Sequence, residues 1–375
     1  MMPMCNGTCA DFMATSGLPR QQPVEVSLAD AQVAIVACMG LSLGAAQIRC
    51  LETARALTAR GTASICLPGC GADTLRRMSG LRLLGVVFIR NLPEFNLLKD
   101  YVRPSTCSVL LDTLDMSPIY HARSCLQRGY LEQIDGIIAN NHASLTRVLE
   151  NCPLLKIKPF HLIEHFHSVT RRVSDGSRWR AKPRALLVQE HRMMHQHGYC
   201  DGIRQALPKD TDFECRPLWG GFNAPKNRVA FLSEHLQLDR AAVRTIAAQH
   251  FGTGAMFTQV YKEWDLLIQW LPTNSSAQRL INALASGVPV VGLRCAPFEE
   301  AVAGNPDILL ASDLEEMRQM TNRLASSEAF RRRVSDAGVA VAQRFTPEAI
   351  CNLYLDAFRA PYPPAPRKPL RCETT

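Results

Sequence analysis

The stretch YKEWDLLIQWLPTNSSAQRLINALASGVPVVGLRCAPFEEAVAG, residues 261–304, decides the fold of this chain. Its apolar run at 265–270 has the length of a strand and is soon followed by a proline. Polar residues suited to capping come next, and apolar residues then recur at helical spacing over 277–285, so a helix is predicted to begin near Ser275. The β-branched run at 288–293 predicts a second buried strand. Together these segments predict a βαβ unit.

The polar turn of this unit is a candidate ligand site. In an open α/β sheet such a turn lies at the carboxyl ends of the strands, where ligands bind. A helix N-terminus that carries hydroxyl and amide side chains can bind a phosphate. Ser275 and Ser276 are placed to do so, but serine is also a common capping residue of helices that only pack. The residues alone leave both interpretations open.

A second pattern of the same kind opens the chain. Residues 31–39 predict a buried strand, a helix follows that ends at Gly61, and residues 62–67 predict the next strand. The turn before this helix is rich in glycine, which is weak support for ligand binding because such turns also serve packing. The chain is therefore predicted to contain two Rossmann-like halves. The turn residues that would approach a ligand are Gly40, Ser42 and Gly44.

Polar side chains follow later strands predicted in the first half. Asp112 and Asp115 come after one of these strands and would serve equally well as structural caps or as contacts for an acceptor. Three histidines, His161, His165 and His167, follow the last strand predicted in this half. Their spacing, without a pattern of carboxylates, favours a contact with a donor substrate or simple loop packing over a metal site.

The length and composition predict a two-domain protein. A chain of 375 residues exceeds one ordinary core. No apolar run is long enough to span a membrane, and the first residues do not resemble a secretory signal, so a cytoplasmic protein is expected. The predicted parts are a disordered leader (1–28), an N-terminal Rossmann-like acceptor domain (29–168), a basic linker (169–184), a C-terminal Rossmann-like nucleotide-sugar domain (185–345), a last helix (346–359) and a disordered tail (360–375).

The cysteine content and the net charge exclude few classes of function. The 14 cysteines are spread through predicted strands and helices without the spacing of a zinc site, so they are expected to be reduced core residues. The net charge of +8 fits a nucleotide sugar, an anionic membrane surface or nucleic acid. Nucleic acid is disfavoured because basic and aromatic residues do not interleave to stack bases. Peripheral membrane contact and the oligomeric state stay open.

The segment ALASGVPVV, residues 283–291, carries a resemblance to a known family. With the helix predicted before it and Glu299 and Glu300 after it, the segment resembles the nucleotide-sugar half of retaining GT-B glycosyltransferases, the group that includes sucrose and glycogen synthases. The order of segments down to Arg344-Phe-Thr-Pro-Glu348 and a last amphipathic helix is similar to that family as well. The resemblance implies an α/β GT-B fold, with two Rossmann-like domains that face a central cleft.

The chain departs from this family at one motif. The family carries two glutamates separated by seven residues, and alignment on ALASG places Asn274 and Asn282 at these positions. Asparagine can hydrogen-bond a sugar hydroxyl, but it cannot supply a negative charge or act as a base. The resemblance therefore implies nucleotide-sugar binding more securely than catalysis.

The resemblance also implies roles for single residues. The donor would be a nucleoside-diphosphate sugar, with no tightly bound cofactor and no metal, and the acceptor would be a hydroxyl of a glycan, a lipid or a protein. A helix dipole and basic side chains would stabilise the departing diphosphate. The implied donor contacts are Arg192, Ser275, Ser276 and Arg279 at the diphosphate, Asn282 at the ribose and Asn274 at the sugar, and the catalytic candidates near the cleft are His165, Glu299 and Glu300.

Three functions remain at this point. Sugar transfer to an acceptor hydroxyl with retention is the preferred hypothesis. A GT-B protein that binds or assembles without turnover is the second, because both motif glutamates are replaced. A sugar-nucleotide epimerase of related fold is the third, and it is disfavoured because the C-terminal part of the chain is more similar to transferases.

Overall fold

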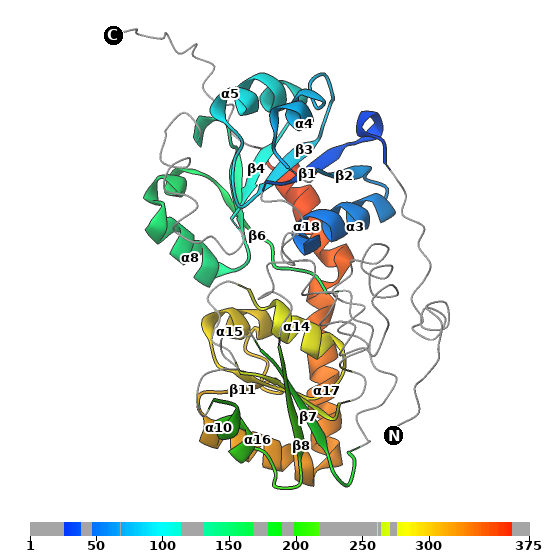
Figure 1. Cartoon of the computed structure of the whole chain (residues 1–375), viewed down its shortest axis with the longest axis vertical. Helices are drawn as coiled ribbons and strands as arrows, with labels where there is room; N and C mark the ends of the chain where they lie inside the picture. The colour runs from blue at the N-terminus through cyan, green and yellow to red at the C-terminus, as the bar shows by residue number, and fades with distance from the viewer. Residues whose placement is uncertain are drawn as a thin grey trace. The chain divides into compact units, whose positions relative to one another are not determined.

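The structure is a computed structural model, and it describes residues 26–38, 47–67, 69–113, 131–167, 179–189, 199–217, 261, 264–270 and 276–361. These residues form two compact units, each built on its own parallel sheet (Figure 1). The first unit contains strand β1, the elements between Arg49 and Glu164, and the residues from Ile350 onward, and the second contains His165–Ala349. Most of the predicted leader, linker and tail lie outside the described residues.

The first sheet has six parallel strands in the order β2-β1-β3-β4-β5-β6. Four of them, β1, β3, β4 and β5, are buried along their whole length, as their continuous apolar runs predict. The strands are β1 (Val33–Ala37), β2 (Ser64–Leu67), β3 (Gly85–Ile89), β4 (Val109–Asp112), β5 (Gly136–Ala139) and β6 (Phe160–Leu162).

Helices connect these strands, and the helix predicted after the first strand is among them. The helix after β1 ends before Gly61, which has the positive φ of 85° that a glycine adopts without strain. Asn141 caps α8 through a capping box with Ser144. The helical segments are η1 (Leu28–Asp30), η2 (Gln47–Glu52), α3 (Thr53–Ala59), α4 (Ala72–Arg76), α5 (Phe95–Leu97), η3 (Leu98–Val102), η4 (Arg103–Ser105), α8 (His142–Asn151), η5 (Pro153–Ile157) and α18 (Pro347–Arg359).

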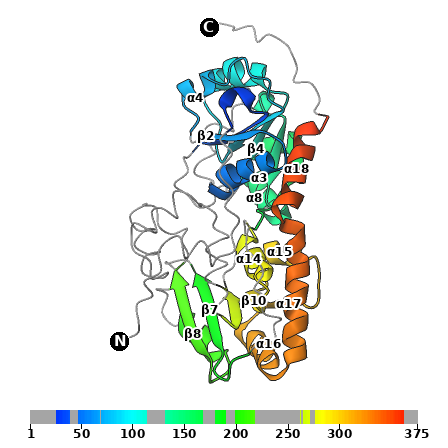
Figure 2. The same ribbon diagram turned by 90° about the vertical axis from the view of Figure 1, so that its right-hand side faces the viewer.

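The last helix, α18, completes the first unit although it comes from the far end of the chain. It lies beside α3, and Arg60 donates a hydrogen bond of 3.1 Å to Asn352 (Figures 1 and 2). Deeper in the packing, the buried ring of Phe358 lies directly against the backbone of Gly85 on β3. The C-terminal helix is therefore part of the core of the N-terminal sheet.

The second sheet has five parallel strands in the order β11-β10-β9-β7-β8. Helix α17 packs on α14 so closely that a Cβ added at Gly338 would lie 3.1 Å from the side chain of Leu284. The elements are β7 (Arg184–Gln189), α10 (Tyr199–Gln205), β8 (Asp212–Pro217), β9 (Leu266–Gln269), α14 (Gln278–Ala285), β10 (Val290–Leu293), α15 (Ala296–Val302), β11 (Leu309–Ala311), α16 (Leu314–Ser326), α17 (Glu328–Ala342) and η7 (Gln343–Phe345).

One predicted boundary is wrong. Helix α14 begins at Gln278, with Ala277 at the N-cap, and not near Ser275. Ala277 is buried, so the apolar face of the helix begins at this residue. The first regular turn of α14 follows it. Ser276 still serves the first turn, because its hydroxyl accepts a hydrogen bond of 3.0 Å from the backbone N–H of Gln278.

Both sheets have the same topology. In each, the first strand lies between the second and the third, so the strand order reverses between β1 and β3 and again between β7 and β9. Open α/β sheets bind ligands outside the carboxyl ends of the strands at such a reversal. The sequence segments that follow β1, β7 and β9 contain Gly40 to Gly44, Arg192, and Asn274 with Ser275.

We expect the close contact between Gly85 and Phe358 to leave no room for a side chain at position 85. A Cβ at position 85 would lie 2.2 Å from the ring, so Gly85→Ala should destabilise the protein by about 1–3 kcal/mol through overpacking. Urea denaturation followed by circular dichroism measures the change. Gly69→Ala is the control, because a Cβ there meets nothing within 4 Å. Equal effects of both substitutions, or no relief of Gly85→Ala by Phe358→Leu, would contradict this packing.

Candidate functional site

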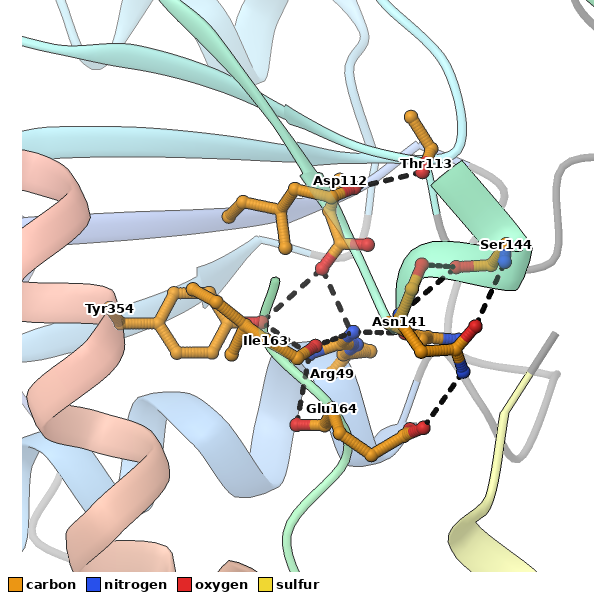
Figure 3. A network of polar contacts seen from close by, with 10 residues as sticks. Arg49, Asp112, Thr113, Asn141, Ser144, Ile163, Glu164 and Tyr354 are labelled. Atoms are coloured by element: carbon orange, nitrogen blue, oxygen red, sulfur yellow. Dashed lines mark hydrogen bonds and ion pairs between the residues drawn. The ribbon is translucent and has the colours of Figure 1, made fainter. Parts of the chain in front are cut away.

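The carboxyl edge of the first sheet carries a buried polar network centred on Arg49 (Figure 3). The arginine side chain is 1% exposed, and its Nε lies 3.4 Å from the carboxylate of Asp112, which ends β4 and is 0% exposed. Asp112 also accepts a hydrogen bond of 3.2 Å from the hydroxyl of Tyr354 on α18. Arg49 donates to the same hydroxyl at 3.0 Å. The network therefore joins η2, β4 and α18.

Arg49 also holds the segment that leads to His165. Its terminal nitrogens donate to the backbone carbonyl of Ile163 and, at 3.5 Å, to that of Glu164. A further hydrogen bond goes to the side chain of Asn140, which follows β5. The two carbonyls immediately precede His165, so Arg49 fixes the backbone from which this histidine extends.

The charges in the network favour the ionised arginine. Burial by itself would lower the pKa of Arg49, but the nearby Asp112, Tyr354 and Glu164 outweigh it and leave that pKa above its usual value. Burial also raises the pKa of the Tyr354 hydroxyl, which therefore stays protonated and can donate to Asp112. An ion pair at this depth needs its hydrogen bonds, because a buried charge without them is costly.

Glu164 extends the network to the start of α8. Its carboxylate accepts a hydrogen bond of 3.2 Å from the side-chain amide of Asn141, the residue that caps α8 (Figure 3). Asn141 thereby contacts both the helix and the segment after β6. Three strand ends, those of β4, β5 and β6, are tied together by this set of side chains.

The strand reversal of the first sheet shows backbone strain. Arg90, which follows β3, has a φ of 69°, a region that residues other than glycine rarely adopt. Its N–H donates 2.8 Å to the carbonyl of Asp112, so the pairing of β3 with β4 fixes this conformation. Cys38, which follows β1, lies nearby because its sulfur donates to the carbonyl of Asn91 at 3.0 Å. The sequence gives no sign of this strained arginine.

The three predicted histidines occupy different environments. His165 is 2% exposed, and His167 forms a contact within the second unit, where its Nε2 lies 3.0 Å from the carbonyl of Ala342. The pKa of His161 is lowered by burial, so this partly exposed ring loses its proton more readily than a free histidine. His167 packs its loop, as one of the two interpretations from sequence predicts.

Three of the predicted donor contacts, Ser276, Arg279 and Asn282, lie just before or on α14. β7 and β9 pair in parallel, so their carboxyl ends lie side by side. Gln269 at the end of β9 is a hydrogen-bond partner of the buried Tyr261, and the charge of Arg279 lies close to the same hydroxyl. Burial raises the pKa of Tyr261, and Arg279 and Gln269 oppose that rise. Asn282, one turn further along α14, is 2% exposed.

Glu299 and Glu300 lie on α15. This helix follows β10, which is the strand next to β9 in the sheet. The carboxylate of Glu299 is half exposed and lies 3.4 Å from the guanidinium of Arg294. Arg294 in turn donates to Ser312 and to the carbonyl of Leu310 on β11. Glu299 therefore takes part in a surface ion pair, and Glu300 is partly exposed.

Several predicted site residues lie outside the described part of the chain. They are Gly40, Ser42, Gly44, Arg192, Asn274 and Ser275, and with them Asp115. Among the described residues, no group of three or more His, Cys, Asp or Glu side chains is arranged to hold a metal ion. None of the helices in the described ranges combines the length and the apolar character needed to cross a bilayer.

Comparison with known proteins identifies the fold. No protein-family model matches the sequence, and no match was found among curated proteins. Solved structures are similar over 88% of this chain: sucrose-phosphate synthase from Thermosynechococcus elongatus (TM-score 0.56, 13% identity, 98% of that chain), Anabaena HepE in complex with UDP and glucose (0.55, 14%, 100%) and a glycosyltransferase from Rickettsia africae (0.55, 12%, 98%). The chain has the fold of these GT-B proteins, and the fold predicted from the sequence is confirmed.

We expect Arg49 to be the main polar determinant of stability in the first unit. Arg49→Met keeps most of the side-chain volume but leaves Asp112 buried without its cation, so it should cost about 3–5 kcal/mol. Arg49→Met combined with Asp112→Asn should recover part of this loss. Arg60→Met is the control, because Arg60 is an exposed arginine directly after α3 and also contacts α18. Urea denaturation in which both arginine variants lose equal stability would refute this role.

Proposed function

We propose that the chain is a glycosyltransferase of the retaining, glycosyltransferase family 4-like type, which moves a sugar from a nucleoside-diphosphate sugar to an acceptor hydroxyl. The observation that carries the proposal is the strand reversal between β7 and β9, with Gln269, Arg279 and Asn282 gathered where β9 passes into α14. GT-B proteins of similar fold support it, since HepE has been solved in complex with UDP and glucose.

The proposed donor site uses the start of α14. Arg279, whose side chain is partly buried, would neutralise charge on the diphosphate together with Ser275, Ser276 and Arg192. Stabilising the charge that develops on the leaving diphosphate is electrostatic catalysis, and it needs no protonated acid at that oxygen. The first N–H groups of α14 add a partial positive charge, although the N–H of Gln278 already donates to Ser276.

The proposal also assigns roles to two asparagines, a histidine, two glutamates and the glycine-rich segment. Asn282 would bind the ribose and Asn274 the donor sugar, in place of the glutamates of the family. His165 would act next to the transferred sugar, with Arg49 holding the two carbonyls before it. Glu299 and Glu300 would contribute near the donor. The glycine-rich segment with Gly40, Ser42 and Gly44 would bind the donor substrate from the first unit.

A binding protein without turnover is the alternative that the residues favour next. Replacement of both motif glutamates by asparagine removes two negative charges from the proposed donor site, and an asparagine amide cannot act as a base. An epimerase is a weaker alternative. The described cysteines are all free thiols, which fits the reducing cytoplasm proposed as the location.

An exposed segment of the first unit has side chains suited to an anionic membrane surface. The protein would meet a lipid-linked acceptor at this surface. Leu154, Ile157 and Phe160 are 42%, 73% and 52% exposed, although large apolar side chains are normally covered. Lys156 and Lys158 alternate with them along η5 and the start of β6. Apolar side chains that insert and lysines that meet lipid phosphates are the two components of interfacial binding. We include this contact in the proposal.

Nucleotide binding tests the donor site. Arg279→Ala should weaken the binding of the preferred nucleoside diphosphate by roughly 10- to 150-fold, the effect of losing one charge-assisted hydrogen bond. The nucleotide is chosen by a thermal-shift screen of UDP, GDP and ADP, and its Kd is measured by calorimetry. Arg332→Ala on α17 is the control, because it removes an equal charge from an exposed arginine of the same unit.

The outcomes of this experiment separate the candidate functions. Binding that is lost in Arg279→Ala, together with release of nucleotide from a donor sugar by the wild type, supports the transferase. Binding without release of nucleotide from any donor in a panel supports the idle binding protein. No binding of any nucleotide, or equal binding by Arg279→Ala and Arg332→Ala, would reject the proposed donor site.

Vesicle sedimentation tests the membrane contact. The double variant Ile157→Ser/Phe160→Ser should lose roughly ten-fold or more of its partitioning onto vesicles of mixed phosphatidylcholine and phosphatidylserine, because two inserted side chains are removed. The matched control is Leu353→Ser, which removes an apolar side chain 41% exposed elsewhere in the same unit. Equal sedimentation of the wild type with neutral and anionic vesicles would contradict the role of the lysines.

A further inference from the structure

Two cysteines of the second unit lie close enough to react with each other. Cys200 is in the first turn of α10, Cys215 is on β8, and their sulfur atoms are 3.3 Å apart. β8 is the outermost of the described strands of its sheet. Both residues are partly exposed, so a small reagent in solution can reach them. A disulfide needs its sulfurs to approach by little more than an ångström from this distance.

We propose that Cys200 and Cys215 are a reversible redox modification site, oxidised to a disulfide by low-molecular-weight disulfides such as glutathione disulfide. The thiolate of one cysteine attacks the reagent, forming a mixed disulfide and releasing one reagent thiolate. The second cysteine then attacks the mixed disulfide and releases the other. The two protons lost by the cysteines pass to the two released thiolates. The cysteine pair loses two electrons and the reagent gains them, so the exchange balances without a further oxidant.

The surroundings of the two cysteines indicate which of them attacks the reagent first. Burial raises the pKa of Cys215, and its contact with Cys200 raises it further. Cys215 is therefore the poorer source of a thiolate, and Cys200 makes the first attack. Cys215 is then positioned to displace the reagent, since its sulfur already contacts that of Cys200. The short separation along the chain, 15 residues, also favours closure within one molecule.

A disulfide here would add a covalent restraint at the beginning of α10, whose later residues already pack in the core of the second unit. Near the C-terminal end of α10, Ala206 accepts a hydrogen bond of 3.0 Å from Thr321 on α16, and Gly202 lies against Leu314. At its beginning, the Tyr199 hydroxyl donates to the carbonyl of Trp270, which follows β9. Joining Cys200 to β8 would restrain the residue next to Tyr199, and through it the end of β9. This restraint does not depend on the proposed function.

A second thiol pair makes site-specific detection necessary. Cys38 hydrogen-bonds to Cys70 in the first unit, and this contact lowers the pKa of Cys70 to about 7. A total thiol count therefore cannot report on Cys200 and Cys215. Peptide mapping by mass spectrometry distinguishes the pairs, because each gives a different linked peptide.

The test uses the full chain in mixtures of reduced and oxidised glutathione. The wild type should yield a peptide linked through Cys200 and Cys215, which reducing agent removes, and Cys200→Ser and Cys215→Ser should not. Closing this loop should raise the Tm of the second unit by roughly 6–12 °C, judged from loop length and domain size. Hydrogen exchange of the α10 amides should slow in the oxidised protein. Cys107→Ser, which removes an exposed cysteine of the first unit, is the control and should change neither result.

Defined results of the same experiment would contradict the proposed disulfide or the proposed restraint on α10. The proposal is overturned if both cysteines stay reduced, or carry separate glutathione adducts, under conditions that oxidise other cysteines of the chain. A linked peptide without a change in Tm or in α10 exchange overturns the restraint on the helix. Nucleotide binding plays no part in these readouts, so failure of the proposed transferase function would not be mistaken for failure of the redox site.

Discussion

Parallel strand pairing is the constraint on which the rest of this structure depends. In each sheet every described pair of strands is parallel, so every connection must cross back over a face of the sheet, and all carboxyl ends meet at one edge. Polar residues that are far apart in sequence are thereby brought together. Asp112, Asn140 and Glu164 meet at one such edge, and Gln269 and Arg279 at the other.

The two edges are built differently. The first is dominated by a buried ion pair whose arginine donates its terminal N–H groups to Tyr354 and to the backbone before His165, which makes it a structural support for that segment. The second has a partly buried guanidinium, that of Arg279, in the first turn of α14, and buried amides at the end of β9 and within α14. The first edge is thus a support within the protein, and the second is the edge at which the donor site is proposed.

The fold could be predicted from sequence because it rests on local patterns. Apolar runs at 33–37 and 290–293 and the glycine after α3 mark strands and helix ends without reference to distant residues. The Arg49 network could not be predicted, because an arginine inside an apolar helical pattern reads as a surface residue until its partners are known. Those partners come from four other segments. The positive φ of Arg90 likewise depends on pairing with β4 and has no local sign.

The position of α18 has a consequence for the order of assembly during translation. Tyr354 supplies a partner to Arg49 across a separation of 305 residues, and Phe358 fills the space over Gly85. At about 5–20 residues per second, a ribosome needs roughly 15–60 s to make the chain between them. The first sheet therefore emerges with an incomplete core and a buried arginine short of one partner. It reaches its final packing only after the second unit has been synthesised, so the N-terminal unit is the last part of this protein to be finished.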